Sequence, residues 1–186
     1  MNTETIKLIV EVISLLVIII SLVIAIQKLG KLNDQLHLVK QQHTDEFEWK
    51  KRESSLKYSG LFHPLIRESK HILQEEFNLY GRSDSIPKQE LLDKMQNNVN
   101  VQIHINNLLT YYENISLSTQ KGIADIDIIY DMVGKTMANL RKKLINYIDY
   151  HRDIAKNERL WKEFEHLATE FEKRGQNPSE KLRHIA

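Results

Sequence analysis

LIVEVISLLVIIISLVIAI, residues 8–26, is the stretch that decides the architecture of this chain. A helix rises about 1.5 Å per residue, so about 20 residues cross a hydrocarbon core of about 30 Å. Ile6 to Ile26 supplies nearly that length, and Gln27 and Lys28 end the apolar run. The stretch therefore predicts one helix that spans a membrane, with the lipid bilayer as its first partner.

The apolar run contains a few polar side chains, among them Glu11, Ser14 and Ser21. Ser hydroxyls can bond to carbonyls of their own helix at little cost. A carboxylate one turn inside the boundary can reach the headgroup region, so we interpret Glu11 first as an interfacial residue. The alternative is a polar contact between spans, which makes all three residues candidate oligomer contacts.

A cleaved signal peptide is the main alternative to a retained span. Signal peptides have a basic n-region and a small-residue cleavage site. Here Glu4 offsets Lys7, and Ala25 is followed by Ile26. Lys28 and Lys31 make the carboxyl-side flank the more basic one, and this flank tends to stay cytoplasmic. We therefore expect a retained single span with its amino terminus outside and residues 27–186 in the cytoplasm.

The composition narrows the class of the remaining chain. Of 186 residues, 26 are Lys or Arg and 25 are Asp or Glu, so the net charge of +1 lacks the strong positive field of a nucleic-acid binder. Cysteine is absent, which removes disulfides, thiol nucleophiles and Cys-ligated metals. Gly and Pro are scarce, which favours long helices.

Leu29, Leu32, Leu36 and Val39 follow the 3, 4, 3 spacing of a coiled-coil seam directly after the span. The same register then reaches His43, so the seam is only about two heptads long. A weak parallel self-association and a helix that leans on its own domain both fit this pattern. These four residues are candidate oligomer contacts.

The rest of the chain predicts an all-α fold: an irregular cytoplasmic bundle of about four helices. Apolar stripes predict helices over residues 64–77, over 88–118, from the cap Asp125, and from the cap Asn157 to Gly175. Residues 99–105 also alternate like a strand, but a lone strand lacks a partner, so helix is preferred. The domain boundaries are therefore 1–28 for the anchor, 29–60 for a helical stalk, 61–175 for the helical domain and 176–186 for a polar tail.

The sequence shows none of the motifs that carry common enzyme chemistry. There is no His-x-x-x-His zinc pattern, no Gly-rich phosphate loop and no Gly-x-Ser-x-Gly elbow. The acidic residues Asp125, Asp127 and Asp131 are interpreted as helix-start residues, and the basic run from Lys135 to Lys143 as a solvated helix face. We predict no cofactor, no metal, no small-molecule substrate and no enzymatic activity.

Two stretches resemble a known family: LLTYYENISLSTQKGIADIDIIYDMVG, residues 108–134, and LWKEFEHLA, residues 160–168. They are similar to small bacterial and prophage membrane proteins grouped as domain of unknown function number 4760. Asn114 departs from the pattern, because a second acidic residue is frequent there. The matching positions are Tyr111, Tyr112, Glu113, Gly122, Asp125, Asp127, Tyr130, Trp161, Phe164 and Glu165.

The resemblance implies a single-pass protein of the bacterial inner membrane and, by association with prophages, a role in phage immunity or superinfection exclusion. It makes Tyr111, Tyr112 and Glu113 a candidate functional surface. The leading hypothesis is a non-enzymatic protein-interaction module that binds an unidentified protein or itself. The alternatives are an oligomerising effector that permeabilises the inner membrane and, as a third class, an enzyme that uses Glu113 with a neighbouring Tyr.

Overall fold

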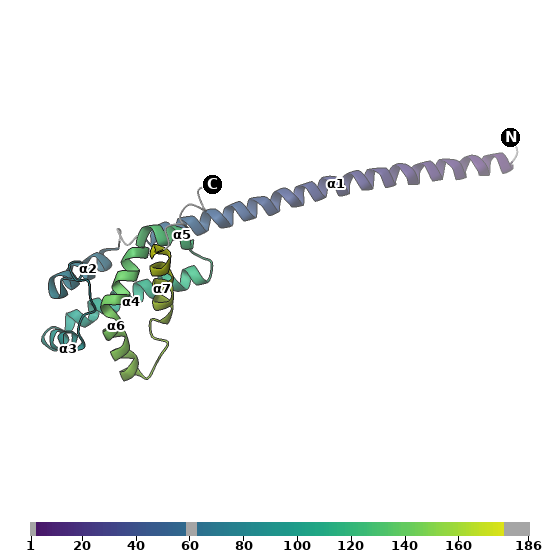
Figure 1. The fold of residues 1–186 in the computed structure, drawn as a ribbon. Coiled ribbons are helices and arrows are strands. Elements are labelled where there is room, and N and C mark those ends of the chain that lie inside the picture. The colour runs from purple at the N-terminus through teal and green to yellow at the C-terminus, as the bar shows by residue number, and fades with distance from the viewer. Residues whose placement is uncertain (1–2, 59–62, 177–186) are drawn as a thin grey trace. The chain divides into compact units, whose positions relative to one another are not determined.

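The computed structural model describes residues 3–58 and 63–176, with the side chains of residues 4–12 left aside. The all-α prediction is confirmed, since the described residues form helices and no strand. The chain divides into two compact units, residues 1–49 and 50–186, which we describe separately. The helices, coloured by residue number in Figure 1, are α1 (Thr3–Lys57), α2 (Pro64–Phe77), α3 (Lys88–Asn97), α4 (Val99–Gln120), α5 (Ile126–Ile129), α6 (Lys135–Ala155) and α7 (Lys162–Gln176).

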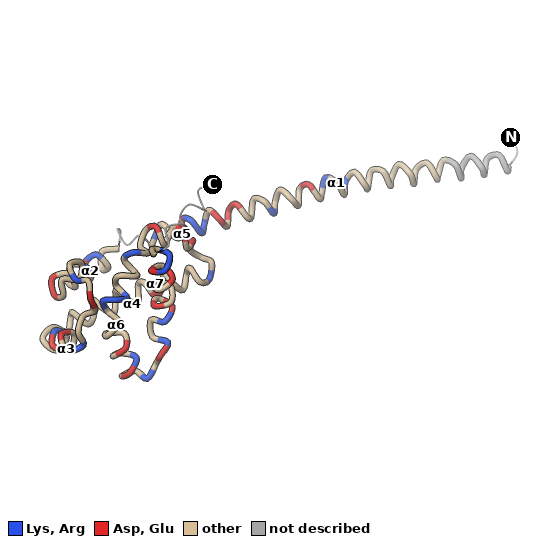
Figure 2. The backbone as a smooth tube through the Cα atoms, viewed as in Figure 1, with Lys and Arg blue, Asp and Glu red and all other residues tan. Residues whose placement is uncertain are grey.

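The first unit is the amino-terminal part of α1. From Ile13 onward this helix contains an 18-residue window of mean hydropathy 2.4, none of it buried. No charged residue lies between Ile13 and Gln27, and Figure 2 shows this part of α1 in tan beyond the grey amino-terminal turns. The helix is therefore long and apolar enough to span a membrane.

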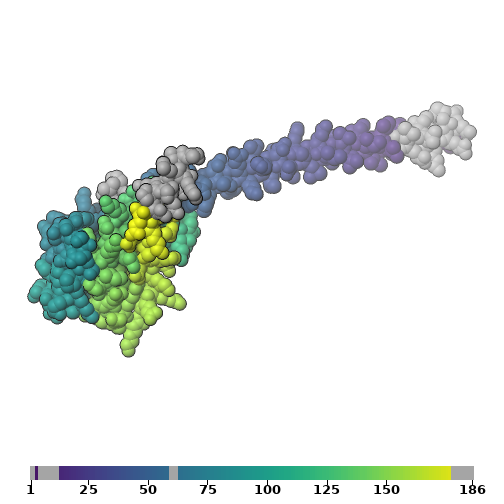
Figure 3. All heavy atoms as spheres, viewed as in Figure 1, coloured from purple at the N-terminus to yellow at the C-terminus, as the bar shows by residue number. Residues whose placement is uncertain are grey.

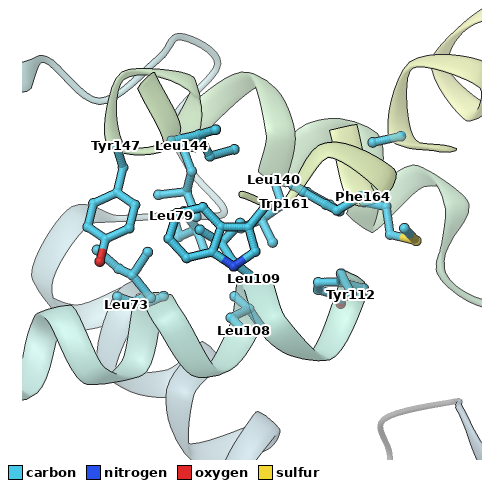
Figure 4. Packing of buried hydrophobic residues seen from close by; sticks show 14 of the residues in the cluster. Leu73, Leu79, Leu108, Leu109, Tyr112, Leu140, Leu144, Tyr147, Trp161 and Phe164 are labelled. Carbon is cyan, nitrogen blue, oxygen red and sulfur yellow. The ribbon is translucent and has the colours of Figure 1, made fainter. Parts of the chain in front are cut away.

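The second unit is a helical bundle in which α4 contacts α2, α3 and α7, while α6 packs on α3 and α7. Its buried core draws on all of these helices, and Figure 4 shows part of it around Trp161. The fully buried large side chains include Leu73 on α2, Leu91 on α3, Tyr112 on α4, Tyr147 on α6 and Phe164 on α7. A continuous apolar core of this kind is the main stabilising contribution in a domain of this size.

Two of the predicted helix boundaries are confirmed by their caps. Pro64 begins α2, where its fixed φ suits the first helical turn. Asp125 caps α5, since its carboxylate accepts the backbone N–H groups of Asp127 at 2.9 Å and Ile128 at 3.2 Å. Gly122, with φ +69°, provides the stop after α4 that the sequence indicates.

The prediction of one helix over residues 88–118 is wrong, because Asn98 divides it into α3 and α4. Asn98 has an extended backbone (φ −147°, ψ 99°), and its side-chain oxygen accepts the N–H of Asn100 at 3.1 Å. Asn favours such caps because its short side chain competes with helical hydrogen bonding. Residues 99–105 are helical, as preferred over a strand, with Val101 and Ile105 buried one turn apart.

The chain between α5 and α6 forms a π-helical turn, Tyr130–Gly134. A Cβ added at Gly134 would lie 2.8 Å from Cδ2 of Tyr130 and 3.4 Å from Cδ2 of Phe171. The Tyr130 and Phe171 rings themselves pack edge to face, with centroids 5.3 Å apart. A side chain at position 134 would therefore displace the Tyr130 ring, which packs on Phe171 of α7.

Gly134→Ala should lower the free energy of unfolding, although Ala is the better helix former by about 1 kcal/mol. The reason is that the Tyr130 ring must move away from the new methyl group. Chemical denaturation of the detergent-solubilised chain would measure the effect. Gly175→Ala is the matched control, because its Cβ would meet only the Tyr130 hydroxyl at 3.8 Å. Equal stabilities of the two variants would contradict the packing role of Gly134.

Candidate functional site

The seam residues of the first unit lie on one continuous stretch of α1. Leu29 is 65% exposed, Leu32 61%, Leu36 68% and Val39 52%. Figure 3 shows the side chains of this part of α1 standing out along the helix. Four large apolar side chains at heptad spacing are thus left open to solvent, which is unusual for a soluble helix.

The polar residues of the span give weaker evidence for contacts between two copies than the seam residues do. The Ser21 hydroxyl donates to the Val17 carbonyl at 2.8 Å, within its own helix. Ser14 lies on the same helix, and the side chain of Glu11 lies outside the described residues. The hydroxyl of Ser21 is therefore satisfied without a neighbouring span.

The carboxyl-terminal end of α1 belongs to the second unit and is fixed there by polar contacts. The Ser55 hydroxyl accepts the backbone N–H of Asp125 at 2.6 Å, and Lys51 lies 3.6 Å from the Asp125 carboxylate. The Tyr58 hydroxyl lies 2.8 Å from that of Ser118. These contacts attach residues 50–58 to the start of α5 and to the end of α4.

Tyr111, Tyr112 and Glu113 lie on α4, and the structure gives each a different role. The Tyr111 hydroxyl donates to the Tyr58 carbonyl at 2.9 Å. Tyr112 is 0% exposed, so its side chain belongs to the core. Glu113 points to the start of α7. The three side chains therefore do not form one exposed surface.

The carboxylate of Glu113 caps helix α7 from a different helix. It accepts the backbone N–H of Phe164 at 2.6 Å and, at 3.4 Å, that of Glu163. These are amides of the first turn, which a Ser or Asp at the start of a helix usually satisfies. The residue before α7 is instead Trp161, which has φ +54° and carries no acceptor. Glu113 on α4 therefore provides the hydrogen-bond acceptor that the residues just before α7 lack.

The surroundings of Glu113 also change its acidity. Burial raises the pKa of the Glu113 carboxyl, and the hydrogen bonds from Phe164 and Glu163 oppose that rise. Burial dominates because an ionised carboxylate loses water when it lies between packed helices. The shift fits a half-buried structural cap, and it carries no catalytic implication by itself.

The acidic residues interpreted as helix-start residues have separate contacts. Asp125 caps α5, and Asp127 pairs with Arg174 at 2.8 Å. Asn157 accepts the N–H of Arg159 and so caps the turn before α7, not α7 itself. Within the residues that the structure describes, no three His, Asp or Glu side chains gather as metal ligands.

The prediction of a solvated face from Lys135 to Lys143 is wrong for Lys143, which is only 8% exposed. Its ammonium donates to the Leu79 carbonyl. Lys142 instead pairs with Glu172 at 2.8 Å. Lys135, Asn139 and Lys143 are four residues apart on α6, so they share a face of that helix.

That face of α6 lines a pocket of about 180 Å³. Lys70 from α2, Tyr112 from α4 and Tyr80 from the following loop complete its polar wall. Sequence reasoning missed this site, because Lys70 on α2 is 65 residues from Lys135, the nearest pocket lysine of α6. The sequence pattern that points to this face of α6 is the four-residue spacing of Lys135, Asn139 and Lys143.

Glu113→Ala should destabilise the domain by about 1 to 3 kcal/mol, because two amides at the start of α7 lose their acceptor. Glu113→Gln keeps an acceptor oxygen and should cost less. In a Trp49→Phe background, Trp161 is the single fluorophore and reports unfolding of the core directly. Glu158→Ala removes an exposed carboxylate as control, and an equal stability of the two Ala variants would contradict the cap.

Comparison with known proteins gives one family. The signature of the family described as Domain of unknown function (DUF4760) matches residues 15–171. No curated protein matches, and no solved structure matches. The match covers the apolar helix, the seam and nearly all of the helical domain, which agrees with the resemblance found in the carboxyl-terminal half. The chain therefore belongs to the DUF4760 family.

Proposed function

We propose that this chain is a membrane-anchored, non-enzymatic protein-interaction module that associates with a second copy of itself through α1. The observation that carries the proposal is the exposed apolar seam of Leu29, Leu32, Leu36 and Val39. Exposed leucines at heptad spacing are stabilised when a parallel helix covers them. The occupant we infer for this face is the same seam of another copy.

The seam continues in the same register into the span. Stepping back by alternate fours and threes from Leu29 leads to Ala25, Leu22, Ile18 and Leu15. Small residues such as Ala25 let helix backbones approach closely in lipid. Two copies inserted in one membrane with the same orientation also meet in parallel, at a raised effective concentration. The membrane therefore favours an association that two heptads alone would support only weakly.

The helical domain is the part that we expect to meet a further protein partner. We place it in the cytoplasm, with the anchor in the bacterial inner membrane, on the charge bias of the flanks of the span. In this arrangement self-association would bring two domains together at the membrane. A role in phage immunity or superinfection exclusion is proposed from the prophage setting implied by the resemblance.

The alternative, an effector that permeabilises the membrane, receives less support from the described residues. It needs polar groups that contact each other between spans. The Ser21 hydroxyl is already bonded to the Val17 carbonyl of its own helix. We therefore keep self-association without leakage as the proposed function.

Single cysteines in this cysteine-free chain should report the seam directly. Leu32→Cys and Leu36→Cys should form disulfide-linked dimers in oxidised membranes, because seam positions of a parallel pair face each other. Gel electrophoresis without reductant would measure the dimer fraction. The matched control is Asp34→Cys, which lies on the opposite face of α1 in the heptad register.

The position dependence decides the outcome. High cross-linking at Leu32 and Leu36 with little at Asp34 would support the parallel pair. Similar yields at all three positions, or no dimer at any of them, would contradict it. A membrane-potential dye in the same cells would separate the two functions, since depolarisation that Glu11→Leu abolishes would favour the permeabilising effector.

Expression of the chain in a phage-sensitive bacterium should reduce plaque formation by at least one challenge phage. Leu32→Asp combined with Leu36→Asp should remove that protection, because charged seams repel each other. The efficiency of plating would measure the effect. Protection that persists in the double variant would contradict a role for self-association, and the absence of protection against a broad phage panel would contradict the antiviral role.

A further inference from the structure

The pocket beside α6 combines positive charge with an apolar wall. Its volume is about 180 Å³. The ammonium-bearing residues are Lys70, Lys135 and Lys143, and no Asp or Glu lines it. Leu79, Leu108 and Leu140 form the apolar part of the wall. Lysines converging on a hollow without acidic residues give it the charge of an anion site.

These lysines lack the carboxylate partners that neighbouring basic residues of α6 have. On the adjoining face of α6, Arg141 and Lys142 pair with Glu172, and Arg152 pairs with Glu165. Among the described residues, neither Lys70 nor Lys135 forms an ion pair. Lys143 is buried, and its ammonium meets a backbone carbonyl. Lys70 is half-buried and Lys135 is exposed. An anion from outside would therefore reach these two side chains and would stabilise the charge of the buried Lys143.

The pKa shifts of Lys143 and Lys70 agree with a pocket that contains no carboxylate. Burial lowers the pKa of Lys143, and the nearby Arg82 lowers it further. Burial also lowers the pKa of Lys70, whose ammonium lies 5.9 Å from the centre of the Tyr112 ring. Both shifts have the direction expected of ammonium groups held away from water and without a carboxylate partner.

Tyr112 adds an independent observation. It is 0% exposed and lines the pocket, and its buried hydroxyl has no hydrogen-bond partner among the described residues. Buried tyrosine hydroxyls are nearly always hydrogen bonded. By contrast, the equally buried Tyr147 donates to Asn106 at 2.7 Å. Tyr112 is therefore a pocket-lining residue whose buried hydroxyl is an unused donor.

We propose that this pocket binds the phosphate group of a small phosphate monoester, with Lys70 and Lys135 as the ammonium contacts and the Tyr112 hydroxyl as a hydrogen-bond donor. A phosphate dianion offers three terminal oxygens to such donors, and Lys is a common phosphate ligand. The leucine wall would contact a short organic part. Binding without turnover is compatible with the expectation that the chain has no small-molecule substrate, and it is independent of the seam.

The test uses the full chain in nanodiscs of zwitterionic lipid, titrated calorimetrically with inorganic phosphate. Lys70→Gln and Lys135→Gln should each weaken binding by about tenfold, the loss expected for one charge-assisted hydrogen bond. The matched control is Lys173→Gln, which removes an exposed lysine outside the pocket. Unchanged affinity in both pocket variants, or equal loss in the control, would overturn the proposal.

Tyr112→Phe separates a ligand role from a structural one. Removing an unpartnered buried hydroxyl should leave the melting temperature without phosphate unchanged or raised, while phosphate binding weakens. Tyr147→Phe should lower the melting temperature and leave phosphate binding unchanged, because it removes the hydrogen bond to Asn106 and lies outside the pocket. Unchanged phosphate affinity in Tyr112→Phe would overturn the donor role of its hydroxyl.

Two further titrations distinguish the source of the phosphate. If a soluble ester is the ligand, glycerol phosphate should bind more tightly than inorganic phosphate in zwitterionic nanodiscs. If a lipid headgroup is the ligand, phosphatidic acid in the nanodisc should weaken the binding of added inorganic phosphate in the unmodified chain but not in Lys70→Gln. Failure of inorganic phosphate and glycerol phosphate to bind, with no effect of phosphatidic acid on the chain, would overturn the proposal.

Discussion

The hydrogen bonds from the first turn of α7 to the carboxylate of Glu113 join the last helix of the domain to α4, the helix that contacts α2, α3 and α7. They fix the start of α7 against the middle of α4, and α7 then packs on α4 and α6. Trp161 enters the core at the same point with a left-handed backbone that costs about 1 to 3 kcal/mol. Burial of its indole and the cap from Glu113 together offset that strain, which explains why an acidic residue of α4 and a Trp–x–x–Phe segment occur in one chain.

The two units of the chain differ in how much of their apolar surface is buried. In the helical domain, large apolar side chains from the six helices α2 to α7 close on one core, and Gly134 leaves room for the Tyr130 ring that packs on Phe171. In the first unit, the apolar side chains of α1 from Ile13 to Val39 are exposed. Lipid can cover those of the span, but the seam that follows has no such cover. This contrast is the physical basis for assigning self-association to α1 and a separate binding role to the domain.

The charges of the domain show a similar division. Three basic residues of α6, namely Arg141, Lys142 and Arg152, pair with carboxylates of α7, as in the pair of Arg152 with Glu165. The lysines around the pocket are not matched in this way, although one of them, Lys143, is buried. Lysines at a pocket that no carboxylate lines indicate an external anion more strongly than their number does. The net charge of the sequence does not reveal this difference, because it sums the paired basic residues and the pocket lysines together with all the carboxylates.

The sequence by itself determined the long apolar helix, the all-α class and the helix starts at Pro64 and Asp125, because each depends on hydropathy, periodicity or a cap within a few residues. It did not reveal the break at Asn98, since an Asn within a continuous apolar stripe is compatible with either one helix or two. Only the tertiary structure decided that Glu113 caps α7, that Tyr112 is buried and that Lys70 and Lys143 line one pocket. These features join residues from different helices, and their energies depend on distances that local sequence patterns do not encode.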